Sequence, residues 1–285
     1  MSTPHPGPHL GEHPGEPSAI SRTRYVFPPS PGRAWLTDLR LPPPARHDHV
    51  IFLRGLPVAP WIALRPWADV WVVWLARLEA LFHEWQAGVS GETARPLPQP
   101  DLGWGAWRER HVHSVEARRV EDGLAALLPL LRRLARDEAG SGAHLIGHSV
   151  GGAVIVSYLA GLRARKHTPP ELPLRAALTL DAAVSGLAGV WSGAKSYLHS
   201  VTQNHVMSEG LHGLNDWAAE QGIRLLTASN HGDLWSHKRL ADLPYLGVRL
   251  GSRLALREQL HGTIHDWLRR TPEFVQAIWG PATAE

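Results

Sequence analysis

The stretch His144-Leu-Ile-Gly-His-Ser-Val-Gly-Gly152 decides the fold expected for this chain. The apolar residues before Gly147 predict a buried strand, and residues 153–163 predict a helix. The pattern G-x-S-x-G between a strand and a helix holds its serine, Ser149, on a sharp and strained turn. Glycines on either side of that serine let the strand and the helix pack closely. The stretch therefore predicts a turn that presents Ser149 as a nucleophile, and the alternative is a serine that only caps the helix.

The helix expected after Ser149 also favours negative charge at its start. The first backbone N–H groups of a helix have no partner within the helix, and the positive end of its dipole lies there. Both stabilise an oxyanion formed beside Ser149.

The composition predicts a folded domain without disulfides. The chain has 285 residues, of which 44% are hydrophobic, and it has no cysteine, which excludes disulfides and cysteine-ligated metals. The formal charge is only +3, and the arginines are mixed with acids, so no nucleic-acid partner is expected. No apolar run reaches the length of a membrane span, and the first residues lack the pattern of a secretory signal. We expect a cytoplasmic protein, and the sequence does not indicate its oligomeric state.

The chain divides into a tail and a folded body. Residues 1–46 are rich in proline, glycine and histidine, and this composition predicts a largely disordered segment. Residues 25–27 and 34–36 are apolar enough to dock as short edge strands. Residues 47–285 form the expected domain. A protein that acts through its proline-rich tail is one alternative interpretation of this organisation.

Strands and helices alternate along the body, which predicts a mostly parallel sheet with helices on both faces. Residues 88–107 are full of turn residues and predict a loop, and residues 182–221 have no dominant period. The latter segment is either a cap over a site or ordinary core. The tryptophans of residues 61–85 recur at helical spacing, so we expect them in the core. The expected strands are 49–53, 111–115, 144–148, 176–180 and 223–228, and residues 248–256 are either a last strand or an extended connection. The expected helices are 61–85, 120–136, 153–163 and 263–278.

A serine needs an adjacent base to take its proton, and the base needs a third group to orient it. In a parallel sheet such groups belong in loops at the carboxyl ends of strands. Asp233 follows the expected strand 223–228, and His261 precedes the last helix. Asp181, directly after strand 176–180, is the alternative acid. His231 and His237 are the alternative bases.

At these residues the sequence resembles the lipases and esterases of the α/β-hydrolase fold. Leu145-Ile-Gly-His-Ser-Val-Gly-Gly152 is close to the common motif L-[IV]-G-H-S-[LM]-G-G, and the similarity extends from about His49 to Gly280. The resemblance implies an α/β-hydrolase fold in which Ser149 is the nucleophile, His261 the general base and Asp233 the orienting acid.

The resemblance also implies the rest of the site. The backbone N–H groups of Val150 and Leu56 would form the oxyanion hole, and no cofactor or metal is needed. The implied substrate is a small-molecule or lipid-like carboxylic ester, with an apolar acyl chain. An acyltransferase or a thioesterase with the same triad, and a non-catalytic binding protein of the same fold, are the alternatives.

Arg54-Gly55 departs from this pattern, because many relatives have His-Gly there. The N–H of Leu56 survives the change. We expect Arg54 to form a salt bridge with a nearby acid, and the alternative is that it binds an acidic group of the substrate.

Histidine is abundant, with 18 residues in the chain. His111 and His113, or His261 and His265, have a spacing that suits zinc. No third ligand accompanies either pair, so no metal site is expected. We expect His148 to pack beneath the turn.

Overall fold

The computed structural model describes residues 24–26, 40–55, 68–88, 103–137, 140–169, 172–203, 211–230, 245–248 and 272–279. Within these residues the chain forms one seven-stranded sheet in the order β1-β7-β6-β5-β4-β2-β3. Every pair of neighbouring strands is parallel. The strands are β1 (Arg24–Val26), β2 (His49–Gly55), β3 (Val112–Ala117), β4 (Ala143–His148), β5 (Leu174–Leu180), β6 (Arg224–Asn230) and β7 (Tyr245–Val248).

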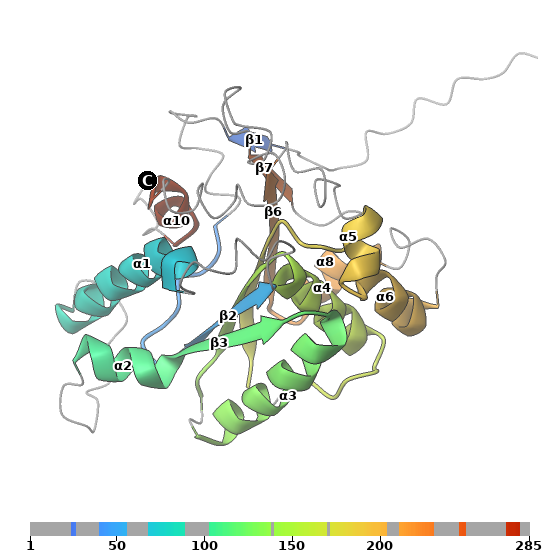
Figure 1. The fold of residues 1–285 in the computed structure, drawn as a ribbon. Coiled ribbons are helices and arrows are strands. Elements are labelled where there is room, and N and C mark those ends of the chain that lie inside the picture. The colour runs from blue at the N-terminus through green and yellow to red at the C-terminus, as the bar shows by residue number, and fades with distance from the viewer. Residues whose placement is uncertain are drawn as a thin grey trace, which may run out of the picture.

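Helices cover both faces of this sheet (Figure 1). One face carries α1 (Ala68–Gln86), α2 (Trp104–His111) and α10 (Pro272–Trp279). The other face carries α3 (Val120–Asp137), α4 (Val150–Arg163), α5 (Gly186–Trp191), α6 (Ala194–Thr202) and α8 (Leu214–Glu220). The predicted architecture, a mostly parallel sheet with helices on both faces, is confirmed. None of the described helices is both long and apolar enough to cross a membrane.

Side chains alternate between the two faces along each strand, as the pleat requires. On β2, Ile51 and Leu53 join the core beneath α3 and α4, whereas Val50 and Phe52 join the core beneath α1. Since both sets are buried, the strand reads as a continuous apolar run, which is typical of parallel sheets covered on both faces.

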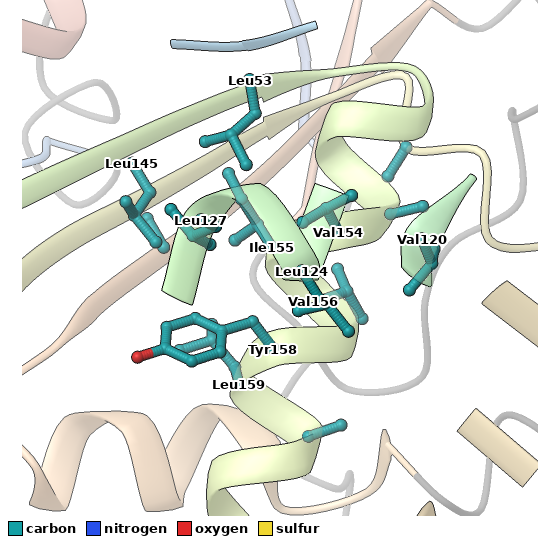
Figure 2. Packing of buried hydrophobic residues seen from close by; sticks show 14 of the residues in the cluster. Leu53, Val120, Leu124, Leu127, Leu145, Val154, Ile155, Val156, Tyr158 and Leu159 are labelled. Carbon is teal, nitrogen blue, oxygen red and sulfur yellow. The ribbon is translucent and has the colours of Figure 1, made fainter. Parts of the chain in front are cut away.

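The core beneath α3 and α4 is almost entirely aliphatic. Figure 2 shows Leu53 and Leu145 from the strands facing Leu127 of α3 and Ile155 of α4. The two helices approach closely at Gly123, where an added Cβ would lie 2.3 Å from a methyl carbon of Val154.

The core beneath α1 is aromatic by contrast. Trp71 stacks on Phe52 with ring centroids 4.7 Å apart, and Trp74 meets Trp279 edge to face at the same separation. The expectation that the tryptophans of this helix pack in the core is confirmed for those the structure describes. The buried apolar residues of α1 are Trp71, Trp74, Leu78, Leu81, Phe82 and Trp85.

The predicted loop at residues 88–107 is wrong in part, because α2 begins at Trp104. Its sequence Trp-Gly-Ala-Trp-Arg-Glu-Arg-His holds a glycine and few apolar residues, so it shows almost no helical periodicity. Trp107 is buried and its indole N–H donates to the carbonyl of Arg46 at 2.9 Å. Tertiary contacts of Trp107 therefore stabilise a helix that the local sequence does not predict.

Two expected elements lie only partly within the described residues. Strand β7 covers residues 245–248, and helix α10 covers residues 272–279 of the helix expected at 263–278. Residues 249–271 lie outside the described residues, as do residues 34–36 and most of the predicted disordered segment 1–46. The edge strand expected at 25–27 is confirmed as β1, which pairs in parallel with β7.

The segment 182–221 forms three short helices in its described part. Ala188 of α5, Leu198 of α6 and Leu214 of α8 are buried in the aliphatic core. Its inner residues are therefore core contacts, and a cap role for the segment stays a prediction.

Candidate active site

The candidate site lies at the carboxyl edge of the sheet, beside the central strand β4. Arg54 of β2, His148 of β4, Leu180 of β5 and Ala228 of β6 are neighbours in register. Because the strands are parallel, the residues that follow them emerge at the same edge. The turn that begins at Ser149 follows β4 and therefore lies at this edge.

Ser149 occupies a backbone conformation that L-residues rarely adopt. Its φ is 58° and its ψ is −120°, directly between β4 and α4. Its N–H donates to the carbonyl of Leu180 at 2.9 Å, and its carbonyl accepts from Ala183 N–H at 3.0 Å. The strained residue is thus held on both sides by the chain that leaves β5. The side chain of Ser149 makes no capping hydrogen bond to α4.

Glycines allow this turn to form. A Cβ on Gly147 would lie 2.5 Å from the carbonyl oxygen of Gly151, and a Cβ on Gly151 would lie 2.0 Å from that of Leu53. Both distances are far below van der Waals contact, so any larger residue would push α4 off the sheet. The predicted reason for the glycines, close packing of strand and helix, is confirmed.

The start of α4 faces the end of β2. An added Cβ on Gly55 would lie 2.7 Å from the backbone nitrogen of Val150 and 3.2 Å from Cβ of Ser149. Val150 is the first residue of α4, and the helix itself supplies no acceptor for its N–H. The N–H expected to hold an oxyanion therefore lies where β2, β4 and α4 meet.

Asp181 follows β5 at the same edge and is completely buried. Its φ is 45°, again in the left-handed region, and its N–H donates to the carbonyl of Ala228 at 2.8 Å. The residue before it, Leu180, accepts the N–H of Ser149. The structure therefore brings the alternative acid next to the Ser149 turn.

Arg54 is only 6% exposed and lies between two strands that carry polar residues. Glu116 of β3 is opposite it in register on one side, and His148 of β4 on the other. Burial lowers the pKa of Arg54, the negative charge of Glu116 raises it, and the balance lies below the usual arginine value. Glu116 is therefore an acid close to Arg54, and the expected salt bridge stays a prediction.

Three residues of the predicted site lie outside the described residues. These are the triad members Asp233 and His261 and the second oxyanion donor Leu56. The alternative bases His231 and His237, and the paired His265, lie outside them too. The structure describes Ser149, Val150 and Asp181, and their roles stay predictions.

A histidine cluster occupies the opposite, amino-terminal end of β2. The rings of His111 and His113 lie 5.1 Å and 5.3 Å from that of His49, and His113 Nε2 is 3.2 Å from His49 Nδ1. The expectation that His111 and His113 share one strand is wrong, because His111 ends α2. In the described part of the chain, no three histidine or acidic side chains form a group that could hold a metal ion.

Sequence reasoning missed a buried, hydrogen-bonded Asp–His pair near this cluster. Asp48 accepts hydrogen bonds from His144 Nε2 at 3.0 Å and from the N–H groups of Gly142 and Ala45 at 2.7 and 2.9 Å. Burial alone would raise the pKa of Asp48, but these bonds and the charge of His144 lower it on balance. The pair ties the starts of β2 and β4 together. An Asp directly before a buried strand was its only signal.

Comparison with known proteins adds little at the level of sequence. No family model matches the chain, and neither does any curated protein. Similar solved structures include the phospholipase PlaB from Legionella pneumophila, at 14% identity and a TM-score of 0.36. That match covers 65% of this chain but 37% of the phospholipase, so the chain spans well under half of that protein.

Two further structures match over most of their length. A monoacylglycerol lipase from Paleococcus ferrophilus is 10% identical, with a TM-score of 0.35, over 82% of this chain and 96% of the lipase. Est1E from Butyrivibrio proteoclasticus is 11% identical, with a TM-score of 0.41, over 81% of this chain and 87% of that protein. Several of the structures found are named as lipases or esterases. At this level of similarity, nothing follows from them about the substrate of this chain.

Proposed function

We propose that the protein is a serine hydrolase that cleaves carboxylic esters, with Ser149 as its nucleophile. The observation that carries the proposal is the conformation of Ser149, with positive φ between β4 and α4. Backbone strain of this kind persists where a nucleophile has to be presented at the top of a sheet. A serine that only caps a helix needs no such strain, and Ser149 makes no capping bond.

In this proposal His261 takes the hydroxyl proton while Oγ of Ser149 attacks the ester carbonyl carbon. The carbonyl oxygen becomes an oxyanion, which accepts hydrogen bonds from the N–H groups of Val150 and Leu56. His261 then gives its proton to the leaving alcohol as the C–O bond breaks, which leaves an acyl group on Ser149. His261 then takes a proton from water as the water attacks the acyl carbon, and gives this proton to Oγ of Ser149 as the acyl–oxygen bond breaks and the carboxylic acid leaves.

Asp233 is the proposed orienting acid, because it follows β6 in the chain order Ser, Asp, His. Asp181 is the alternative, and its complete burial beside the Ser149 turn favours it. A buried carboxylate that accepts a histidine N–H holds the ring in the tautomer that catalysis needs.

The proposed substrate is an ester with an apolar acyl chain, because the segment 182–221, which donates a hydrogen bond to the carbonyl of Ser149 through Ala183, is rich in apolar residues. The rates at which the protein hydrolyses a panel of neutral esters with acyl chains of increasing length measure this preference directly.

The test of the proposal is covalent labelling by a fluorophosphonate probe, which reacts with an activated serine. We expect the wild-type protein to be labelled at Ser149 and to hydrolyse p-nitrophenyl esters. Ser149→Ala should lose both, with a drop in kcat of about 10⁶-fold if the triad acts as one unit, and should keep its circular dichroism spectrum. Unlabelled, folded wild-type protein without esterase or thioesterase activity would instead identify a binding protein of this fold.

Two asparagine variants, compared side by side, identify the aspartate that orients the histidine. Replacing the true orienting acid by asparagine should lower kcat by about 10⁴-fold, because the histidine then takes the wrong tautomer. We expect this loss for Asp233→Asn and a smaller one for Asp181→Asn, and the reverse order would assign Asp181. Added alcohols that divert the product from acid to new ester would show acyl transfer in place of hydrolysis.

A further inference from the structure

A cavity of about 510 Å³ lies on the α1 side of the sheet, where α1 and α2 meet the strands β2 and β3. Figure 1 shows α2 beside α1 and leading directly into β3, which stands at one end of the strand order. The volume is within the roughly 300–1,000 Å³ that small-molecule sites occupy. None of the described residues that line it belongs to the Ser149 turn, so an inference from this cavity does not rest on the proposed function.

The inner wall of the cavity is apolar and partly aromatic. Phe52 of β2 and Trp71 of α1, whose rings stack on each other, form its centre. Leu75, one turn further along α1, and Val112 of β3 are half-buried and complete this wall. A flat aromatic group packs well against such a wall, because aromatic rings prefer offset-stacked or edge-to-face contacts with one another.

Gly105 of α2 leaves the cavity open. Nothing lies within 4 Å of an added Cβ at this position, and its φ is not in the left-handed region. Neither close packing nor backbone conformation therefore requires a glycine here, although glycine destabilises a helix relative to alanine. Because Gly105 lines the cavity, a larger residue would place its side chain in that space. The missing side chain keeps the cavity accessible.

Arg108 and Glu109 bring opposite charges to the α2 side of the cavity. Both are exposed, and in the part of the chain that the structure describes neither side chain forms an ion pair or a hydrogen bond. Adjacent residues of a helix point about 100° apart, so the two charges do not face each other. Each can therefore bind a group of opposite charge on the same ligand. An arginine can donate two parallel N–H bonds to a carboxylate, and a glutamate accepts from an ammonium group.

We propose that this cavity binds an aromatic amino acid in its free, zwitterionic form. The aromatic ring packs on the wall formed by Phe52, Trp71 and Leu75, the carboxylate binds Arg108, and the ammonium group binds Glu109. The apolar wall supplies most of the affinity, and the two charges supply the selectivity. A neutral ligand leaves both charges without a partner, and a ligand with one charge leaves one of them so.

The experiment is isothermal titration calorimetry of the full chain with four ligands that share an indole ring and differ in charge. L-Tryptophan carries both charges, indole-3-propionate only the negative one, tryptamine only the positive one, and N-acetyltryptophanamide neither. We expect tryptophan to bind, and each of the others to bind about tenfold or more weakly, because each lacks at least one charge-assisted hydrogen bond.

A substitution that fills the cavity tests its position. Gly105→Leu should weaken tryptophan binding at least tenfold, because the leucine side chain occupies the space of the ligand. The matched control is Ala106→Leu, which adds the same side chain at the next residue of α2, an exposed position outside the cavity lining. It should bind tryptophan like the wild type. Thermal unfolding checks that both variants are folded.

Two further variants separate the charges. Arg108→Gln should bind tryptophan and tryptamine about equally, because the carboxylate no longer finds a cation. Glu109→Gln should bind tryptophan and indole-3-propionate about equally, because the ammonium group no longer finds an anion. Each variant should keep the preference that depends on the other residue.

Each outcome decides the proposal. A folded wild type that binds none of the four ligands would overturn it, and so would one that binds them equally or Gly105→Leu that binds like the wild type. Ser149→Ala should bind tryptophan as the wild type does. Tryptophan binding by a protein without esterase activity would therefore support the cavity site and count only against the proposed function.

Discussion

At the scale of single residues, the Ser149 turn depends on neighbouring glycines, which have no Cβ atom. The backbone oxygen of Leu53 lies 2.0 Å from where Gly151 would carry a Cβ, and backbone cannot move aside as a flexible side chain can. At Gly55 the nearest atom to an added Cβ is again a backbone atom, the nitrogen of Val150. Small residues therefore decide both the fold of the turn and the space beside its first N–H group.

Gly55→Ala is expected to damage catalysis more than stability. The new methyl group would lie 2.7 Å from Val150 N, so this N–H must shift from the place where, in the proposed function, it holds an oxyanion. Loss of one such donor costs about 10²–10³ in kcat, measured with p-nitrophenyl esters. The control is Gly105→Ala in α2, where nothing lies within 4 Å of the added Cβ. It should leave kcat unchanged, and equal losses in the two variants would contradict the prediction.

At the scale of elements, α2 places its last residue against the start of the sheet. His111 stacks on both Trp107 and His49, with ring centroids 5.0 and 5.1 Å apart. Burial lowers the pKa of His111 to about 3, together with the charges of His49, Arg110 and His47. Burial and the charges of His49 and Arg133 lower the pKa of His113 to about 4. The folded protein therefore keeps these rings neutral.

The cluster predicts a loss of stability in mild acid. In the unfolded chain each histidine binds a proton near pH 6.5, whereas the folded values are about 3 and 4. The unfolded state thus binds more protons between these limits, and the free energy of unfolding falls as the pH drops from about 6.5 towards 4. Urea titrations at a series of pH values measure this slope.

His113→Gln is expected to flatten that slope, because one proton fewer binds on unfolding. The exposed His199 of α6 supplies the matched control, and His199→Gln should leave the slope as it is. A wild-type protein equally stable at pH 7 and pH 4.5 would contradict the role assigned to the cluster.

At the scale of the whole molecule, the two sides of the sheet are packed differently. The glycines of the Ser149 turn bring α4 directly against the sheet, and the core there is aliphatic. On the other side, tryptophans fill the space beneath α1. The C-terminal α10 completes this layer: Trp279 is 1% exposed, its carbonyl accepts from Arg77 at 3.2 Å, and the carbonyl of Ile278 accepts from Leu41 N–H at 3.2 Å.

Trp279→Ala is expected to lower the free energy of unfolding by about 3–5 kcal/mol, because it removes a large side chain from a closed layer. The edge-to-face contact with Trp74 is lost with it. Denaturant titration measures the effect. Val72→Ala, at a largely exposed position of α1, should change stability by less than about 0.5 kcal/mol. Similar effects of both substitutions would contradict the packing described for α10.

Local signals and long-range contacts contributed differently to what could be predicted. Strands β2 and β5 contain apolar runs, β4 contains the apolar pair Leu145-Ile146, and the glycines around Ser149 have a fixed spacing, so the parallel sheet and its central turn were predictable. Helix α2 was not, because its stability comes from the burial of Trp107 and not from its own periodicity. The cavity between α1, α2 and β3 was equally hidden, since one of its walls is this helix.

The sequence by itself determined the Ser149 turn, the α/β class and the core role of the α1 tryptophans, because each depends on spacing along a few neighbouring residues. Only the tertiary structure decided that Asp181 lies beside Ser149, that Glu116 faces Arg54, and that His111 meets His49 from a helix. These pairs depend on strand register and on the position where α2 ends. Both are set by packing across the whole sheet, which no local pattern records.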